Sequence, residues 1–198
     1  MGLPEKLKSD TAKLHLQLEE NNWIRLLTSG KISIQEYKSI LALFFGYFSP
    51  LEQKLNQFES EILAFLPDFQ ERRKSVALLS DLEALQKNQN STVSVSICSD
   101  LPHVTSLAEA FGCMYVIEGS TLGGRVISKH LNKALGLSAG TGLSFFSGYG
   151  DRTGERWSTF RKALQTFSES SMANDNLVIE SANQSFLKFN NWLNSTNE

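Results

Sequence analysis

The sequence is poor in cysteine and proline and has no marked excess of either charge. Its 198 residues include 2 cysteines and 4 prolines. Two cysteines exclude both a disulfide framework and a zinc site built from four thiolates. Lys and Arg total 19 against 21 for Asp and Glu. Because phosphate binding normally requires a strong basic excess, we do not expect nucleic acid as a partner.

Long hydrophobic runs are also lacking. No apolar run is long enough to span a bilayer, and the opening residues MGLPEKLKSD contain no signal-peptide core. Hydrophobic residues make up 41% and charged residues 20% of the chain, which is typical of a soluble globular protein. We therefore expect one domain over residues 1–198, located in the cytoplasm, with its oligomeric state open.

Apolar side chains at helical spacing account for nearly the whole chain, and the two-residue alternation of strands is almost absent. We therefore predict an all-α fold, formed as one multihelical domain and not as a simple up-down bundle. The predicted helices cover residues 4–20, 23–27, 33–58, 68–87, 106–134, 154–169 and 174–194.

Local signals define several helix boundaries. Capping boxes of the form S-x-x-E mark two helix starts, at Ser33–Glu36 and Ser106–Glu109. Pro50 lies inside the first of these helices and is expected to kink it without ending it. The polar residues 88–96 and the glycines within 136–142 predict loops. The inner face of the helix over 68–87 is expected to consist of Val76, Leu79, Leu82 and Leu85.

The helix predicted over 106–134 contains an unusual run, Glu118-Gly-Ser-Thr-Leu-Gly-Gly-Arg125. Each glycine inside a helix costs about 1 kcal/mol relative to alanine, so Gly119, Gly123 and Gly124 together cost roughly 3 kcal/mol. Two explanations are open: close packing against another helix, or a flat ligand lying against bare backbone over which the helix bends. The run is neither a P-loop nor a dinucleotide-binding fingerprint.

His15 lies on the first predicted helix, one turn before Glu19. One interpretation is a partly buried structural histidine paired with Glu19. The other is a neutral imidazole metal ligand that a carboxylate orients through its second nitrogen. His103 and His130 have no His or Glu at metal-ligand spacing, and no Glu-x-x-His motif of the di-iron type is present. A lone helical histidine is a poor zinc site but is sufficient as the proximal ligand of haem.

Three segments, in this order, resemble the haem oxygenase family and especially its bacterial, biliverdin-producing members. They are Leu7–Glu19 around His15, Met114–Gly124 with the glycines, and Phe145–Trp157, which is similar to a stretch of the phytochrome-associated members. The resemblance extends over essentially the whole chain. It implies a multihelical fold in which a kinked, glycine-rich distal helix covers bound haem.

The resemblance also implies an activity and a site. Haem is both cofactor and substrate, and O2 with electrons from a ferredoxin or a flavin-type reductase converts it to biliverdin, ferrous iron and carbon monoxide. A bilin-accepting phytochrome is a further implied partner. His15 is the implied proximal ligand of the haem iron, and Glu19 orients it. The distal catalytic segment consists of Gly119, Ser120, Gly123 and Gly124, and the other implied haem contacts are Lys8, Thr11, Tyr115, Arg156 and Arg161.

Ser120 departs from the animal-type pattern, in which an Asp at this position anchors the water network that delivers protons. A serine hydroxyl can hold a water molecule but supplies no negative charge. This leaves open a haem-binding protein of the same fold without turnover. A third alternative is the thiaminase-like branch of the fold, which requires a pocket cysteine; Cys113 lies on the distal helix but has no obvious basic partner.

Overall fold

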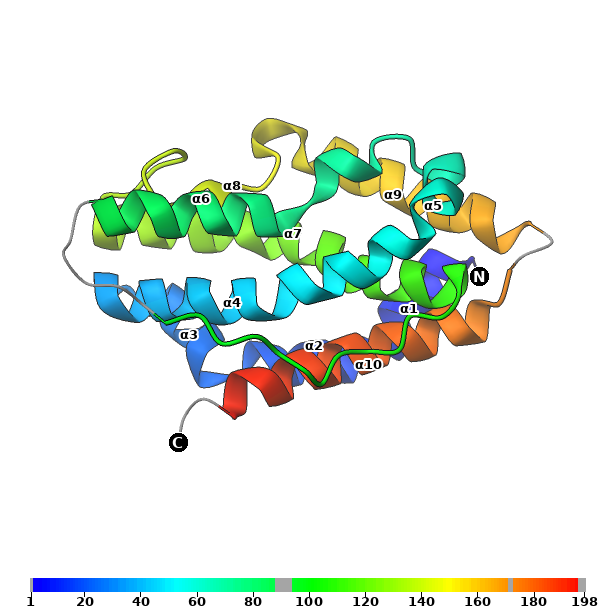
Figure 1. Ribbon diagram of the computed structural model, residues 1–198, viewed down its shortest axis with the longest axis horizontal. Helices are drawn as coiled ribbons and strands as arrows, with labels where there is room; N and C mark the ends of the chain where they lie inside the picture. The colour runs from blue at the N-terminus through cyan, green and yellow to red at the C-terminus, as the bar shows by residue number, and fades with distance from the viewer. Residues whose placement is uncertain (1, 88–93, 171–172, 196–198) are drawn as a thin grey trace.

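The computed structural model describes residues 2–87, 94–170 and 173–195, and within these ranges all regular structure is helical, as predicted (Figure 1). The loop predicted over 88–96 lies mostly outside the described residues. The α-helices of the described ranges are α1 (Leu3–Asp10), α2 (Ala12–Glu19), α3 (Asn22–Thr28), α4 (Ile34–Leu55), α5 (Glu59–Phe65), α6 (Lys74–Lys87), α7 (Leu107–Leu135), α8 (Ser144–Ser147), α9 (Thr153–Ser168) and α10 (Asp175–Asn194).

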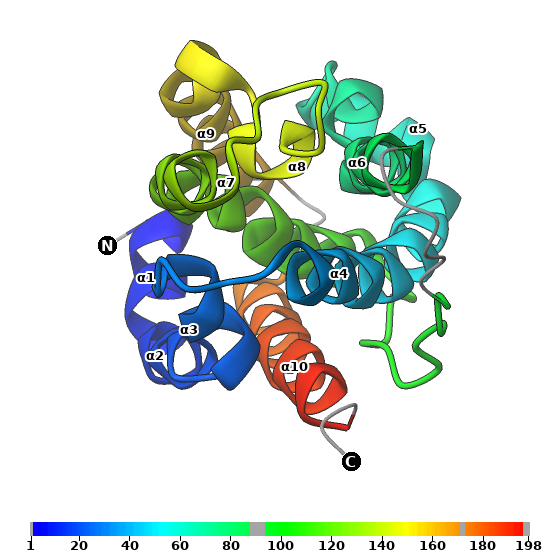
Figure 2. The same cartoon turned by 90° about the vertical axis from the view of Figure 1, so that its left-hand side faces the viewer.

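The helices form two groups on either side of α4. Helices α6, α7, α8 and α9 lie on one side and α1, α2, α3 and α10 on the other (Figures 1 and 2). α7 and α10 join the two groups by packing closely. A Cβ atom on Gly112 of α7 would lie 2.4 Å from the carbonyl oxygen of Val178 and 2.9 Å from the backbone nitrogen of Ala182. Only glycine allows the two backbones to approach so closely.

α4 is the central helix, and its sequence signals are confirmed. Ser33 and Glu36 form the reciprocal capping box at its start, and Pro50 lies inside a helix that continues to Leu55. The helix is buried on nearly all sides. The aromatic core around it includes Phe44, Tyr47, Phe48, Phe145 and Phe189.

Helices α3, α7, α9 and α10 agree with their predicted ranges, and two other ranges are corrected. The helix predicted over 4–20 is interrupted at Thr11, whose hydroxyl donates to the carbonyl of Leu7 at 2.7 Å. The helix predicted over 68–87 begins only at Lys74, because residues 69–72 form a 3-10 turn and Arg73 is extended.

The predicted inner face of α6 is wrong in two of its four residues. Val76 is 64% exposed and Leu79 is 46% exposed, whereas Leu82 and Leu85 are buried as expected. The fully buried Asp81 explains the rotation of the helix. Its carboxylate accepts from the backbone N–H groups of Ser144 and Phe145 at 2.7 and 2.8 Å, so this polar residue faces inward to cap α8.

α7 is one continuous helix that contains all three glycines of the distal segment. Its two halves point in different directions, since in Figure 2 the second half is seen nearly end-on while the first runs obliquely. Gly136 in the left-handed conformation (φ 69°) ends the helix. Among the described residues, no helix is both long and apolar enough to cross a membrane.

Candidate functional site

His15 lies on the exposed side of α2. Its side chain is 55% exposed, and its Nδ1 lies 3.7 Å from Oε1 of Glu19. This distance exceeds that of a direct hydrogen bond, so the carboxylate acts on the ring electrostatically or through a water molecule. The ring of Phe186 on α10 meets the imidazole edge-on, with centroids 5.7 Å apart. The imidazole is therefore oriented from two sides and accessible on the rest of its surface.

α2 as a whole exposes apolar surface. None of its eight residues is buried, and Leu16 beside His15 is 59% exposed. An amphipathic helix of a globular protein normally buries its apolar stripe. On α7, Leu122 and Val126 are also exposed, by 41% and 56%. These exposed apolar side chains are adjacent in the sequence to His15 on α2 and to the glycines on α7.

The three glycines of α7 have different surroundings. A Cβ atom on Gly123 would meet nothing within 4 Å, and one on Gly119 would meet only the Trp157 ring, at 3.8 Å. Gly124 is buried, and its Cβ atom would lie 3.0 Å from the carbonyl oxygen of Phe146 in α8. Close packing therefore accounts for Gly124, which we no longer assign to the catalytic segment. It does not account for Gly123.

Ser120 is exposed on α7, but its hydroxyl is already engaged. The Oγ donates to the carbonyl of Ile117 at 2.7 Å. Its proton is therefore used inside the helix, while the oxygen can still accept a hydrogen bond from a water molecule.

The fold brings together three of the predicted haem contacts. Thr11, at the junction of α1 and α2, lies close to the hydroxyl of Tyr115 on α7. Burial raises the pKa of Tyr115, and the Thr11 side chain and the charge of Arg161 on α9 oppose this rise. Arg161 also donates to Glu5 at 2.5 Å, in a pair that is about half exposed. Lys8 is exposed on α1.

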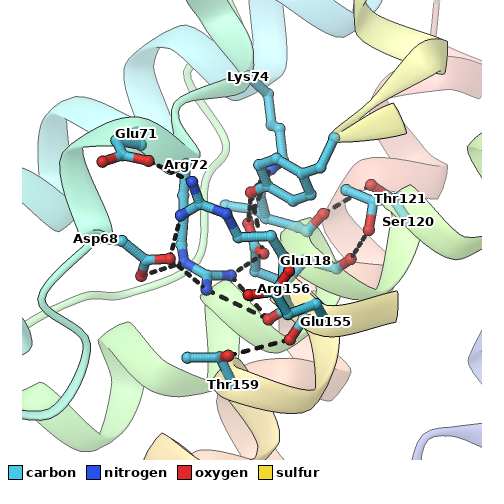
Figure 3. Close-up of polar contacts among 12 residues, drawn as sticks. Asp68, Glu71, Arg72, Lys74, Glu118, Ser120, Thr121, Glu155, Arg156 and Thr159 are labelled. Carbon is cyan, nitrogen blue, oxygen red and sulfur yellow. Dashed lines mark hydrogen bonds and ion pairs between the residues drawn. The ribbon is translucent and has the colours of Figure 1, made fainter. Parts of the chain in front are cut away.

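Arg156 belongs to a different site. It is 8% exposed, and its two terminal nitrogens pair with Asp68 and Glu71 (Figure 3). These partners hold the guanidinium in the protein interior, so we correct the expectation that it contacts haem.

A buried ion cluster lies where α7 meets the start of α6. Glu118 of α7 has 1% of its side chain exposed. Its carboxylate accepts from Arg72 Nη1 at 2.5 Å, from Lys74 Nζ at 2.8 Å and from the Tyr149 hydroxyl at 2.8 Å (Figure 3). We refer to these four residues, together with Asp68, Glu71 and Arg156, as the Glu118 cluster.

Arg72 links the parts of the Glu118 cluster. It donates to both carboxylate oxygens of Asp68, at 2.8 and 2.9 Å, and to the backbone carbonyl of Arg156 at 3.3 Å. Lys74 Nζ donates to the Tyr149 hydroxyl at 2.6 Å and lies 4.4 Å from the centroid of that ring. The cluster thus joins the start of α6, α7, the loop after α8, and α9.

Burial and the charge of the ion-pair partners shift the pKa of Lys74 and of Asp68 in opposite directions, whereas for Tyr149 the Glu118 charge adds to the effect of burial. Burial lowers the pKa of Lys74, although Glu118 opposes the shift. Burial and the nearby Glu118 charge raise the pKa of Tyr149 well above its usual value. Burial alone would raise the pKa of Asp68, but hydrogen bonds and charge from Arg72 and Arg156 lower it.

Sequence reasoning gave the Glu118 cluster no role. One available signal was a carboxylate that directly follows the apolar residues Met114–Ile117 of a buried helix. A buried charge is rare unless it is paired, so Glu118 required cationic partners. Periodicity could not identify them, because they lie 31–46 residues away along the chain.

The fold and this site define a class of all-helical protein in which one helix presents an accessible histidine and another presents bare backbone beside exposed apolar side chains. Residues 1–195 match the family model described as "Heme oxygenase". The chain belongs to this family, whose members are haem-degrading oxygenases.

The individual relatives share about a quarter to a third of their residues with this chain over the matched regions. The chain is 25% identical to heme oxygenase 1 of Gallus gallus over 200 residues, which cover 93% of this chain and 66% of the chicken protein. It is 31% identical to heme oxygenase of Xanthomonas campestris pv. campestris (strain 8004) over 110 residues, or 56% of this chain and 61% of that protein. The matched region thus spans about two thirds of the length of these curated relatives.

A solved structure supports the fold over nearly the whole of this chain. Heme oxygenase from Leptospira interrogans superimposes with a TM-score of 0.75 at 22% identity, covering 98% of this chain and 100% of that chain.

Proposed function

We propose that this chain is a haem oxygenase that opens haem to biliverdin, ferrous iron and carbon monoxide, using O2 and external electrons. The observation that carries the proposal is the combination of an accessible His15 on α2 with the open space beside Gly123 on α7, in a chain of this family. Among the described residues, no group of three or more His, Cys, Asp or Glu could hold a metal ion. The accessible His15 offers a single imidazole, and one imidazole is sufficient as the protein ligand of haem iron.

The residues fit a flat, largely apolar ligand with two carboxylates. Leu16, Leu122 and Val126 supply exposed apolar surface for the ring. Arg161 and Lys8 would form charge-assisted hydrogen bonds with the propionates, and the hydroxyl of Tyr115 would add a neutral one. Thr11 is buried and its hydroxyl already donates to the Leu7 carbonyl, so it would support the site only through its position beside Tyr115. When bound, haem supplies both the iron centre and the ring that is oxidised.

The protein's own groups would orient the ligand and leave room for oxygen. Glu19 lies on the Nδ1 side of His15 and favours a proton there, which leaves Nε2 free to bind iron. Gly123 places no side chain in the space above the ring. The oxygen of Ser120 can accept a hydrogen bond from a water molecule and hold it near this space.

We propose a ferredoxin or a flavin-type reductase as the electron donor. Between Gly119 and Leu135, α7 has no acidic residue, and Arg125, Lys129 and Lys133 are exposed at four-residue spacing. These side chains share one face of the helix and suit an acidic partner.

We assign the reaction to the cytoplasm, because Cys98 and Cys113 are both unpaired thiols, as is usual in reducing compartments. A phytochrome that accepts the bilin remains a proposal drawn from the resemblance of residues 145–157. Tyr149 of that segment donates a hydrogen bond to the buried Glu118, and this contact accounts for its presence without a phytochrome.

A haem-binding protein without turnover is the second candidate, and the engaged hydroxyl of Ser120 favours it. The thiaminase-like alternative lacks support. The thiol of Cys113 is fully buried and lies 3.4 Å from the Ser181 hydroxyl on α10, and burial raises its pKa, which disfavours the reactive thiolate.

Reconstitution with hemin distinguishes these candidates. We expect a Soret band on titration, followed by a bilin spectrum when ascorbate or reduced ferredoxin is added under air. A Soret band that persists without any bilin would identify the binding protein. Failure to bind hemin would exclude both haem-based functions.

A further inference from the structure

The glycine segment of α7 lies between two fixed points. Glu118 directly precedes Gly119 and is held in the buried cluster, whereas Gly124 at the other end packs against the Phe146 carbonyl of α8. Between them, a Cβ atom on Gly119 would meet only the Trp157 ring and one on Gly123 would meet nothing within 4 Å, whereas Thr121 is buried. Glycine lowers the stiffness of a helix because it leaves the backbone more conformational freedom. The position of the two open glycines therefore depends on the ends of the segment and on Thr121.

The attachment at Glu118 is strong and specific. Its carboxylate faces Arg72 and Lys74, whose side chains are only 2% and 7% exposed. The Tyr149 hydroxyl accepts from Lys74 and donates to Glu118. Three cations (Arg72, Lys74 and Arg156) balance three carboxylates (Asp68, Glu71 and Glu118) in the pairs of the cluster. Removing one partner of such a group leaves uncompensated buried charge.

We propose that Glu118 is a positioning residue for ring opening: the Glu118 cluster holds the glycine segment at a fixed place over bound haem and so selects the ring edge that is oxidised. This inference rests on the proposed function. Glu118 acts through the backbone of α7, which it shares with Gly119 and Gly123. A misplacement of about 1 Å in a reacting geometry can reduce a rate on the order of 10²-fold, so a small shift of the segment has a large effect.

The test uses the hemin-reconstituted full chain with Glu118→Gln, which keeps the shape of the side chain and removes its charge. Tyr149→Phe is a milder second variant, since it deletes one hydroxyl and keeps the ring. Tyr47→Phe is the matched control for Tyr149→Phe. Tyr47 is also buried, but its hydroxyl donates to the Ser185 carbonyl on α10, a helix that contributes no residue to the cluster. Unfolding of each apoprotein measures the purely structural effect.

Two readouts follow the position of the segment. The first is the ratio of bilin isomers together with the rate of ring opening at saturating hemin. The second needs no turnover: it is the affinity of azide for the ferric complex, which reports the space on the distal side. We expect E118Q to bind hemin like the wild type, to open the ring at least tenfold more slowly, and to change both the isomer ratio and the azide affinity. Y149F should change them in the same direction but less, and Y47F should leave them unchanged.

The inference is overturned if the wild type forms bilin and both E118Q and Y149F keep its isomer ratio and azide affinity. It is equally overturned if Y47F reproduces their effects, because loss of any buried hydrogen bond would then suffice. If the wild type binds hemin but forms no bilin, the proposed function itself fails, and the role of Glu118 in ring opening fails with it.

Discussion

At the residue scale, the proposed iron binding depends on one imidazole. His15 is accessible, and Glu19 and Phe186 restrict its orientation. Because its side chain is 55% exposed, the fold depends little on this residue.

His15→Ala tests this assignment. We expect the variant to fold as the wild type does, because the side chain is more than half exposed, and to lose the strong axial ligand of bound hemin. The visible spectrum and the hemin affinity measure the loss, and added imidazole should restore the spectrum in part. An unchanged hemin spectrum in H15A would show that another group binds the iron.

Asp68 links the Glu118 cluster to acid stability. Its folded-state pKa lies below the ordinary 3.8, so its contribution to stability is complete above that pH and is lost as the pH falls through the lowered pKa. At neutral pH we expect Asp68→Asn to lower the free energy of unfolding by about 1–3 kcal/mol, the range for hydrogen bonds to charged groups.

The difference between wild type and D68N should then shrink as the pH falls below 3.8. Denaturant unfolding of both proteins over a pH series measures it. A difference that stays constant from neutral pH to the acid transition would mean that the Asp68 charge contributes nothing to the cluster.

At the scale of the helix, α7 combines two kinds of glycine that are adjacent in sequence. Gly123 is open, and Gly124 is packed against α8. The same substitution at the two positions should therefore have opposite effects on stability.

Gly123→Ala should raise the free energy of unfolding of the apoprotein by up to about 1 kcal/mol, the helix propensity difference, and should slow or redirect ring opening while hemin still binds. Gly124→Ala should lower the free energy of unfolding, because its Cβ atom would lie 3.0 Å from the Phe146 carbonyl oxygen and overpacking typically costs about 1–3 kcal/mol. Denaturant unfolding and bilin formation measure the two effects. If G123A destabilises the apoprotein as much as G124A does, the space beside Gly123 is not open.

The sequence predicted the long helices, and it singled out His15 and the glycines of α7 as candidate site residues, because each depends on local signals. Capping boxes mark the starts of α4 and α7, and His15 and Gly123 are each unusual within their own helix. The short helices α5 and α8 were missed, since neither is long enough to show a period. The inner face of α6 was wrong because Asp81 turns inward to cap α8, a tertiary contact that periodicity does not contain. Arg156 was misassigned for the same reason, as its partners Asp68 and Glu71 lie far away in the sequence.

At the scale of the whole molecule, α2 and the second half of α7 expose the apolar side chains Leu16, Leu122 and Val126. A ligand that covers both helices links two parts of the chain that otherwise share few contacts. Its binding energy is then added to the stability of the folded state.

Hemin should therefore stabilise the protein against unfolding. At a free concentration of 100 times the Kd, mass action predicts about 2.7 kcal/mol, which thermal unfolding detects as a rise in Tm. H15A should show a smaller rise at the same hemin concentration. Equal rises in wild type and H15A would indicate hemin bound elsewhere on the surface.

The most direct test of the central claim is a single turnover of the hemin complex under air, with bilin absorbance and released carbon monoxide measured in the same sample. We predict that the wild type yields bilin and carbon monoxide in equal amounts as the Soret band disappears, and that H15A yields little of either. A wild-type complex that keeps its Soret band and releases no carbon monoxide in the presence of reductant would contradict the account.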